Sequence, residues 1–140
     1  MEAALPRERL PDTREGVTRR LAIAGRKLYP RVGCYEDGRP GELFITEAGA
    51  SGTDRALLLD ALGQAVSIGL QYGVPLRAFV DRWIGTHGES SGFTGDAEIP
   101  SASSILDLLG KWMRQRWPDQ ASGASLPPPE REDNDGQSTD

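Results

Sequence analysis

The chain has 140 residues, of which 37% are hydrophobic, so it can form at most one modest domain. Its net charge of −5 comes from residues 118–140, with six acidic residues and one basic residue, while residues 1–117 hold 15 of each sign. One cysteine excludes an internal disulfide and a multi-cysteine metal site. The chain shows neither a signal peptide nor an apolar run of the ~20 residues that a membrane span needs. We therefore expect a cytoplasmic protein with no membrane contact.

Residues 1–15 are polar and contain two prolines, which predicts an extended arm. Residues 17–24 alternate between apolar and polar side chains, as a half-buried strand does. Residues 28–35 predict a second strand, in which Pro30 favours an edge position or a bulge because proline cannot donate to the ladder. Residues 43–46 predict a third strand, so we expect a three-stranded antiparallel meander.

Residues 51–73 predict the longest helix, with Ser51 or Thr53 as its cap and Gly73 at its end. Its polar residues form one narrow stripe, and nearly every other position is apolar or small. Such a helix is expected to be mostly buried, lying across the sheet at the centre of the core. The members of the stripe are Asp60, Gln64, Ser67 and Gln71.

Two further helices are predicted, one from Pro75 to Ile84 and one that begins at Ser101 and ends before Pro118. Between them, residues 85–100 form a long loop rich in glycine. The fold class is therefore α+β, a three-stranded meander packed under a long buried helix. We expect an arm at 1–15, a domain at 16–117, and a disordered acidic tail at 118–140.

Basic residues gather near the predicted first turn. They form either a solvated face of the sheet or a face that binds a phosphate, a nucleotide or a nucleic acid. The candidates for anion or nucleotide binding are Arg19, Arg20, Arg26, Lys27 and Arg31.

Cys34 lies near the end of the second predicted strand. A catalytic pair with His87, the only histidine, is one interpretation, but Cys34 shares a strand face with Val32 and is better interpreted as a small buried hydrophobe. The nearby carboxylates of Glu36, Asp37 and Glu42 are candidates for acid–base or metal chemistry. The Asp-Gly and Pro-Gly pairs favour a plain hairpin turn instead, and no metal site is predicted.

The glycine-rich loop precedes a helix N-terminus, where backbone N–H groups could hold an anion. It has no P-loop pattern, and a capping loop without a ligand is an equal alternative. The candidate site residues in this loop are His87, Glu89, Ser90, Ser91 and Thr94.

Three segments, in the same order along the chain, carry a resemblance to a known family. The segments are LPDTREGVTRRLAIAG…YPRVGCYEDGRPGELFI, AVSIGLQYGVPLRAFVDRW and FTGDAEIPSASSILDLLGKW. Together they resemble the C-terminal, TSCPD-type region of vitamin B12-dependent (class II) ribonucleotide reductases, over residues 10–117. The resemblance implies a family that uses adenosylcobalamin, a thiyl radical and paired cysteines to make deoxyribonucleotides.

The chain departs from that family in its chemistry. It lacks the long catalytic barrel, the reactive cysteines and the TSCPD motif itself, and His87 stands where the family tends to have arginine after Thr86. We therefore expect an accessory or regulatory module of deoxyribonucleotide (DNA precursor) synthesis that is not catalytic alone and binds no cofactor itself. Its partner would be a reductase catalytic chain or a second copy, through the sheet edge or through a surface formed by Trp83, Trp112 and Trp117.

Two alternatives remain. The first is a nucleotide- or nucleic-acid-binding domain that uses the basic sheet face, and in it the acidic tail would compete for the basic arm. The second is an enzyme built on Cys34 or His87, the least favoured interpretation.

Overall fold

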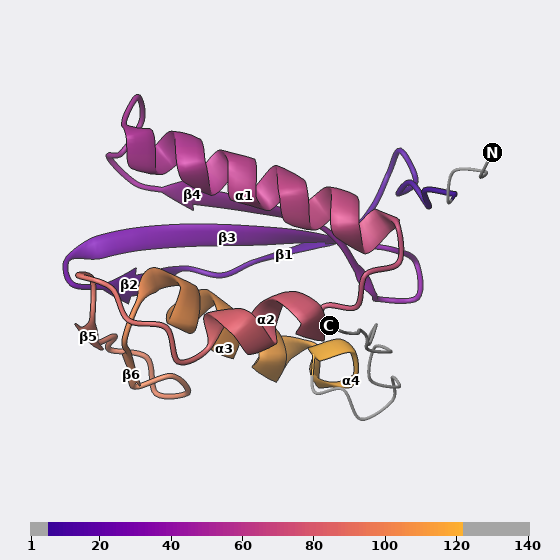
Figure 1. Cartoon of the computed structure of the whole chain (residues 1–140). Coiled ribbons are helices and arrows are strands. Elements are labelled where there is room, and N and C mark those ends of the chain that lie inside the picture. The colour runs from indigo at the N-terminus through magenta and orange to yellow at the C-terminus, as the bar shows by residue number, and fades with distance from the viewer. Residues whose placement is uncertain (1–5, 122–140) are drawn as a thin grey trace, which may run out of the picture.

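The computed structural model describes residues 6–121 as a sheet with packed helices, which confirms the α+β class (Figure 1). Residues 6–15 of the expected arm contain neither helix nor strand, and residues 118–121, at the start of the expected tail, form a helical turn. The rest of the expected tail, 122–140, lies outside the described residues, as do residues 1–5. The elements in chain order are β1 (Gly16–Thr18), β2 (Leu21–Ile23), β3 (Arg26–Cys34), β4 (Pro40–Glu47), α1 (Asp54–Gln71), α2 (Arg77–Trp83), β5 (Gly92–Phe93), β6 (Ser101–Ala102), α3 (Ile105–Arg116) and α4 (Pro118–Ala121).

β3 is the central strand of the main sheet. It pairs antiparallel with β1 and β2 on one side and with β4 on the other. Thr18 lies opposite Arg31 and Leu21 lies opposite Leu28, so β1 and β2 share one register and form a single interrupted row. The predicted three-row meander is therefore confirmed. The turn into β3 has positive φ at Ala24 and Gly25, as a tight two-residue hairpin requires.

Pro30 explains the interruption. The predicted edge position is wrong, because Pro30 lies in the middle of β3. Its carbonyl accepts a hydrogen bond from the Arg19 backbone N–H at 3.1 Å, but its own nitrogen has no hydrogen to donate in return. The missing bond falls between β1 and β2. The irregularity in the pairing of β3 with β4 lies elsewhere, between Gly33 and Cys34.

α1 lies along the outer edge of β4 (Figure 1). Thr53 caps the helix, as predicted, and its hydroxyl accepts from the Ala56 N–H at 3.1 Å. Ser67 Oγ accepts from the Leu43 N–H at 2.8 Å, so a helix side chain pairs a backbone group of the edge strand. A Cβ on Gly63 would lie 2.6 Å from the Leu43 carbonyl oxygen, so this close approach requires glycine. The helix thereby covers a strand edge that would otherwise be open to pairing.

The predicted burial of nearly all of α1 is wrong. Ser67 and Gln71 of the expected polar stripe face the strand edge, and the buried Gln71 amide donates to the Gly41 carbonyl at 3.0 Å. Leu57 and Leu58 instead are 64% and 67% exposed. The physical reason is that the helix meets polar backbone at the edge, so its polar side chains turn inward and apolar ones remain outside.

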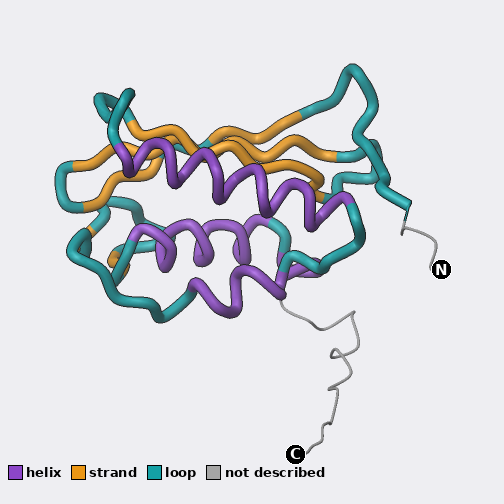
Figure 2. The backbone as a smooth tube through the Cα atoms, turned by 45° about the horizontal axis from the view of Figure 1, so that its top comes forward, coloured by secondary structure: helices purple, strands orange, loops and turns teal. Residues whose placement is uncertain are grey.

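The core lies between one face of the sheet and α1, α2 and α3. In Figure 2 the strands run along the top of the view and the helices lie below or in front of them. The tryptophans that were expected to form a docking surface are part of this core, so that prediction is wrong. Trp83, Trp112 and Trp117 are only 7%, 2% and 5% exposed.

The opposite face of the sheet is open to solvent. Strand residues alternate, so the neighbours of the core residues point to this second face. They are exposed or half-buried in the structure, and they comprise Lys27, Tyr29, Arg31, Phe44 and Thr46. Separately, none of the helices within residues 6–121 is long and apolar enough to cross a membrane.

Candidate functional site

The hairpin between β3 and β4 is a turn that also holds the arm. Asp37 Oδ1 accepts from the Arg39 backbone N–H at 3.1 Å, and Gly38 has a φ of +91°, which confirms the predicted turn chemistry. Arg39 then forms ion pairs with Asp37 at 2.7 Å and with Glu8 of the arm at 3.0 Å. These hydrogen bonds and charges lower the pKa of Asp37. Asp37 therefore has a structural role in the turn, as the favoured interpretation predicted, whereas Glu36 is exposed.

Glu42 also binds a residue of the arm. It accepts two hydrogen bonds from the Arg14 guanidinium, at 2.6 and 3.0 Å, and Glu42 is buried. The hydrogen bonds that Arg14 donates to Glu42 raise the pKa of Arg14. Such a two-pronged pair neutralises the carboxylate and fixes both side chains. The carboxylates of Glu42 and Asp37 do not form a shared site, because Glu42 pairs with Arg14 and Asp37 pairs with Arg39.

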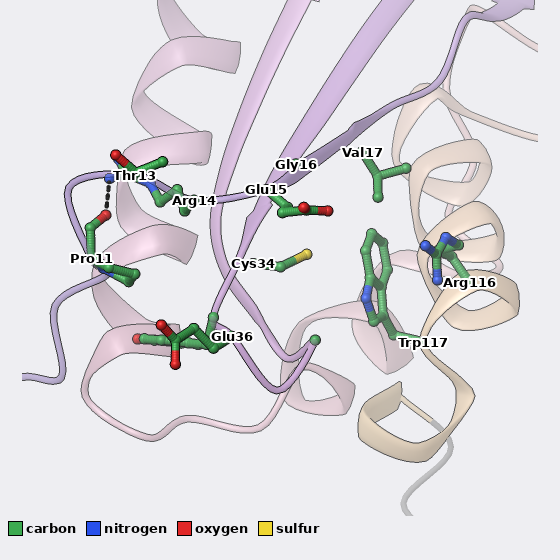
Figure 3. Close-up of a pocket in the computed structure, with 12 residues that line it drawn as sticks. Pro11, Thr13, Arg14, Glu15, Gly16, Val17, Cys34, Glu36, Arg116 and Trp117 are labelled. Atoms are coloured by element: carbon green, nitrogen blue, oxygen red, sulfur yellow. Dashed lines mark hydrogen bonds between the residues drawn. The ribbon is translucent and has the colours of Figure 1, made fainter.

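Cys34 lines a hollow of about 560 Å³ between the arm, the hairpin and the end of α3 (Figure 3). Its thiol is buried, which confirms the inward-facing prediction, and points into this hollow together with Glu15 and Trp117. Burial raises the pKa of the Cys34 thiol, against an opposing effect of the nearby Arg116 charge. A thiol held in the neutral form is a poor nucleophile. His87 is not among the residues that line the hollow.

The five predicted basic residues divide into two groups. Arg19 forms an ion pair with Asp96 of the loop. Arg26 forms an ion pair with Glu47 at 3.3 Å and donates a hydrogen bond to Ser90 Oγ at 2.9 Å. Arg19 and Arg26 therefore connect the loop to the sheet. The other three, Arg20, Lys27 and Arg31, are exposed. The register on either side of the β1–β2 break places Arg20 opposite Tyr29, on the open sheet face with Lys27 and Arg31.

The open face also carries two aromatic residues that sequence reasoning missed. Phe44 of β4 is 50% exposed and lies directly opposite Arg31, and Tyr29 is its diagonal neighbour on β3. The sequence could have indicated this exposure, because side chains alternate between the two faces of a strand, and Phe44 and Tyr29 lie at positions between the buried residues of their strands. Beside Phe44 and Arg31 is a second hollow of about 500 Å³, whose wall includes Arg14 and Glu42.

The residues proposed for a loop site do not gather around a hollow. Ser90 is buried and held by Arg26, and the Thr94 hydroxyl donates to the Ile99 carbonyl, so both have structural hydrogen bonds. His87, Glu89 and Ser91 are exposed. None of the five lines the hollows described above or the third one near the start of α1. A ligand site in the loop stays a prediction.

Asp107 is the residue that fixes this loop. Its side chain is buried, and it accepts from the backbone N–H groups of Gly85 at 2.8 Å and Ser103 at 2.9 Å. Lys111 lies 2.9 Å away as its ion pair. Burial alone would raise the pKa of Asp107, but the hydrogen bonds and the Lys111 charge outweigh it and lower the pKa. Asp107 thus fixes both ends of the loop.

The outer face of α1 carries several exposed apolar side chains. Leu57, Ile68 and Tyr72 lie on one stripe of the helix and are 64%, 45% and 42% exposed. Ala61 and Ala65 continue the stripe between them and are exposed as well. An apolar stripe on the solvent side of a helix is typical of a surface that packs against a partner.

The described residues do not suit a metal or a corrinoid. Within residues 6–121 no three histidine, cysteine, aspartate or glutamate side chains gather closely enough to hold a metal ion. The hollow at Cys34 is lined by the arm, by hairpin backbone and by Trp117, and it offers no residues suited to enclosing a flat macrocycle of cobalamin size. The expectation that this chain itself binds no adenosylcobalamin stays a prediction.

Comparison with known proteins places this geometry in a family. The model of the TSCPD domain matches residues 4–116. The vitamin B12-dependent ribonucleotide reductase of Rhodopirellula baltica is 45% identical over 107 residues, which cover 76% of this chain and 10% of that reductase. The reductase of the same name from Bradyrhizobium diazoefficiens is 42% identical over 104 residues, covering 74% of this chain and 8% of the relative. The one from Streptantibioticus cattleyicolor is 37% identical over 103 residues, covering 74% and 17%.

The chain therefore spans less than a fifth of the length of these curated relatives. No solved structure matches it. The family match nevertheless covers the arm, the sheet and the three main helices, which is nearly all of the described chain. The chain belongs to the TSCPD domain family, and its body is similar to the C-terminal region of vitamin B12-dependent ribonucleotide reductases.

Proposed function

We propose that this chain is an accessory module that docks on the catalytic chain of a vitamin B12-dependent ribonucleotide reductase and supports deoxyribonucleotide synthesis without performing the reaction itself. The observation that carries the proposal is the apolar outer face of α1. In the relatives the same domain is a small part of a much longer chain. A domain joined to such a body needs a surface that packs against it, and α1 offers one.

The residues of this surface suit a protein interface. Tyr72 is an aromatic anchor with a polar tip, and Leu57 and Leu58 supply aliphatic side chains that are more than three-fifths exposed. The surface has no Lys or Arg on its central stripe, and the cores of protein interfaces are likewise depleted of charge. Docking by strand addition at β4 is not supported, because α1 already lies along that edge.

The chemistry of Cys34 supports a role without catalysis. A thiol–disulfide cycle requires a thiolate and a second sulfur. Cys34 is the only cysteine of these 140 residues, it is buried, and burial raises its pKa. The hairpin carboxylates of Glu42 and Asp37 are held by Arg14 and Arg39.

Direct binding tests the proposal. The full chain is titrated into a vitamin B12-dependent reductase chain from the same organism, with any TSCPD domain of that reductase removed, and the heat of binding is measured. We expect saturable binding that Leu58→Glu weakens at least tenfold, because a buried unpaired carboxylate is strongly unfavourable.

The matched control is Phe93→Ala, which alters an apolar side chain that is 88% exposed on β5, away from α1. This variant should bind like the natural chain. Absence of binding by the natural chain, or equal weakening by the two variants, would contradict docking through α1.

A further inference from the structure

We infer that the open face of the main sheet binds single-stranded nucleic acid, with Tyr29 and Phe44 stacking on bases and Arg20, Lys27 and Arg31 contacting phosphates. This is a second activity, on a surface distinct from the α1 face to which the reductase is proposed to dock. The sequence suggested a basic face. In the structure only three of the five predicted basic residues lie on this face, and two aromatic residues, Tyr29 and Phe44, lie beside them.

The charge on this face is available to a ligand. Arg19 and Arg26 are excluded because ion pairs with Asp96 and Glu47 hold them toward the loop and the core side. Arg20, Lys27 and Arg31 are exposed and share one face of the sheet. The guanidinium of Arg31 lies over the backbone of Gly16, and a Cβ added to Gly16 would be 2.5 Å from Arg31 Nη1. The Arg31 guanidinium therefore lies against the surface of the sheet.

The aromatic side chains stand among these cations. Phe44 lies opposite Arg31, and Tyr29 lies opposite Thr46, so the two rings are diagonal neighbours on adjacent strands. Phe44 is 50% exposed, which is costly for an apolar side chain on a strand unless a partner covers it. Aromatic rings on an open antiparallel sheet, flanked by basic side chains, form the platform on which unpaired bases stack.

The hollow beside Phe44 extends the platform. Its wall combines Phe44 and Arg31 with Arg14, Thr13 and the carboxylates of Glu42 and Asp12. The bidentate pair with Arg14 neutralises Glu42, so that carboxylate does not repel a phosphate. The hollow, of about 500 Å³, could accept one base or sugar at the end of the platform.

The geometry favours a single strand over a duplex or a free nucleotide. Base faces are hidden in a duplex, so stacking on Tyr29 and Phe44 requires unpaired bases. The cations lie on two rows of the sheet, with Arg20 on the β1–β2 row and Lys27 and Arg31 on β3, and so match a run of phosphates better than a single polyphosphate. Ribose and deoxyribose strands share this chemistry, and the experiment distinguishes them.

Fluorescence anisotropy of the full chain with labelled oligo-dT and oligo-U, at low and rising salt, tests the inference. We expect binding to one or both single strands, with log K falling at a slope of about −2 against log salt for three phosphate contacts. Phe44→Ala should weaken binding about 5- to 150-fold at any salt, the range found for loss of one base–aromatic stack. Arg31→Gln should reduce the salt slope by about 0.7.

Two matched controls lie off this face. Phe93→Ala removes an exposed aromatic residue of β5, and Arg114→Gln removes an exposed cation of α3. Both should bind like the natural chain, and thermal unfolding should show every variant folded. Should Phe44→Ala prove unfolded, Lys27→Gln and Arg31→Gln carry the test through the salt slope.

Three results would overturn the inference. They are the absence of binding at low salt, tighter binding to duplex or to mononucleotides than to single strands, and equal loss in the control variants. A fourth result, in which Phe44→Ala leaves oligonucleotide binding unchanged but weakens capture of the reductase chain, would assign the face to protein docking instead.

Discussion

At the scale of single residues, Asp107 holds the segment between α2 and α3 in place. Its carboxylate fixes both ends of the segment between α2 and α3 through Gly85 and Ser103, and Lys111 balances its charge. Because these partners lower the pKa of Asp107, the stabilisation is present above the pKa of about 3.9 of an unfolded aspartate. It is lost as the pH falls through the lower, folded pKa.

Asp107→Asn should therefore lower the free energy of unfolding by about 1–3 kcal/mol at neutral pH, since buried donors lose a charged acceptor. Urea unfolding at several pH values measures the effect, and the gap between the two proteins should narrow below pH 4. Asp81→Asn, at an exposed position of α2, is the control and should change stability little. Equal stability of Asp107→Asn and the natural chain at neutral pH would show that the network is not stabilising.

Cys34 should react slowly with thiol reagents. Burial shields its sulfur and raises its pKa, so both access and the thiolate fraction are low in the folded chain. The rate of labelling with iodoacetamide at pH 7 should be at least several-fold lower than that of the chain unfolded in urea. A Ser91→Cys variant in a Cys34→Ser background, with its thiol at an exposed site, provides the comparison. Faster labelling of native Cys34 than of that exposed cysteine would revive a catalytic role.

At the scale of elements, the contact between α1 and β4 determines which helix face remains outside. Gly63→Ala tests it, because a methyl group would stand 2.6 Å from the Leu43 carbonyl oxygen. Alanine is favoured over glycine in a helix by about 1 kcal/mol, so a helix without this contact would gain stability. We expect a net loss of about 1–2 kcal/mol in chemical unfolding, because overpacking against backbone exceeds that gain.

Gln64→Ala is the matched control, since Gln64 is the exposed neighbour on the same helix. It should be neutral or slightly stabilising. A gain of stability in Gly63→Ala, similar to that from helix propensity alone, would mean that α1 does not lie against the edge of β4 as described.

The main strands and helices were predictable from the sequence because they depend on local signals, whereas β5, β6 and α4 were not predicted. Thr53 is a capping residue, Asp37-Gly38 is a turn pair, and the strand rows follow the alternation of apolar side chains. Strand order and helix orientation depend on distant contacts. Pro30 could enter the central strand only because β1 and β2 are interrupted opposite it, and Ser67 turned inward only because Leu43 offers an edge N–H.

At the scale of the whole molecule, the fold separates two exposed surfaces. The outer face of α1 carries apolar side chains, and the open sheet face carries aromatic and basic ones. The sequence indicated the basic residues but not which of them are free, because the pairing of Arg19 with Asp96 and Arg26 with Glu47 joins segments far apart in the chain. The apolar outer face of α1 was missed because an amphipathic pattern does not say which side of the helix meets the core.

The central claim is that this chain supports a reductase in trans through α1. The most direct measurement is ribonucleotide reduction by a vitamin B12-dependent reductase chain from the same organism, with any TSCPD domain of its own removed, assayed with and without the full chain. We predict that adding the chain raises the rate, that Leu58→Glu abolishes most of the increase, and that Phe93→Ala keeps it. The same rate with and without the natural chain would contradict the account, as would an increase that Leu58→Glu leaves intact.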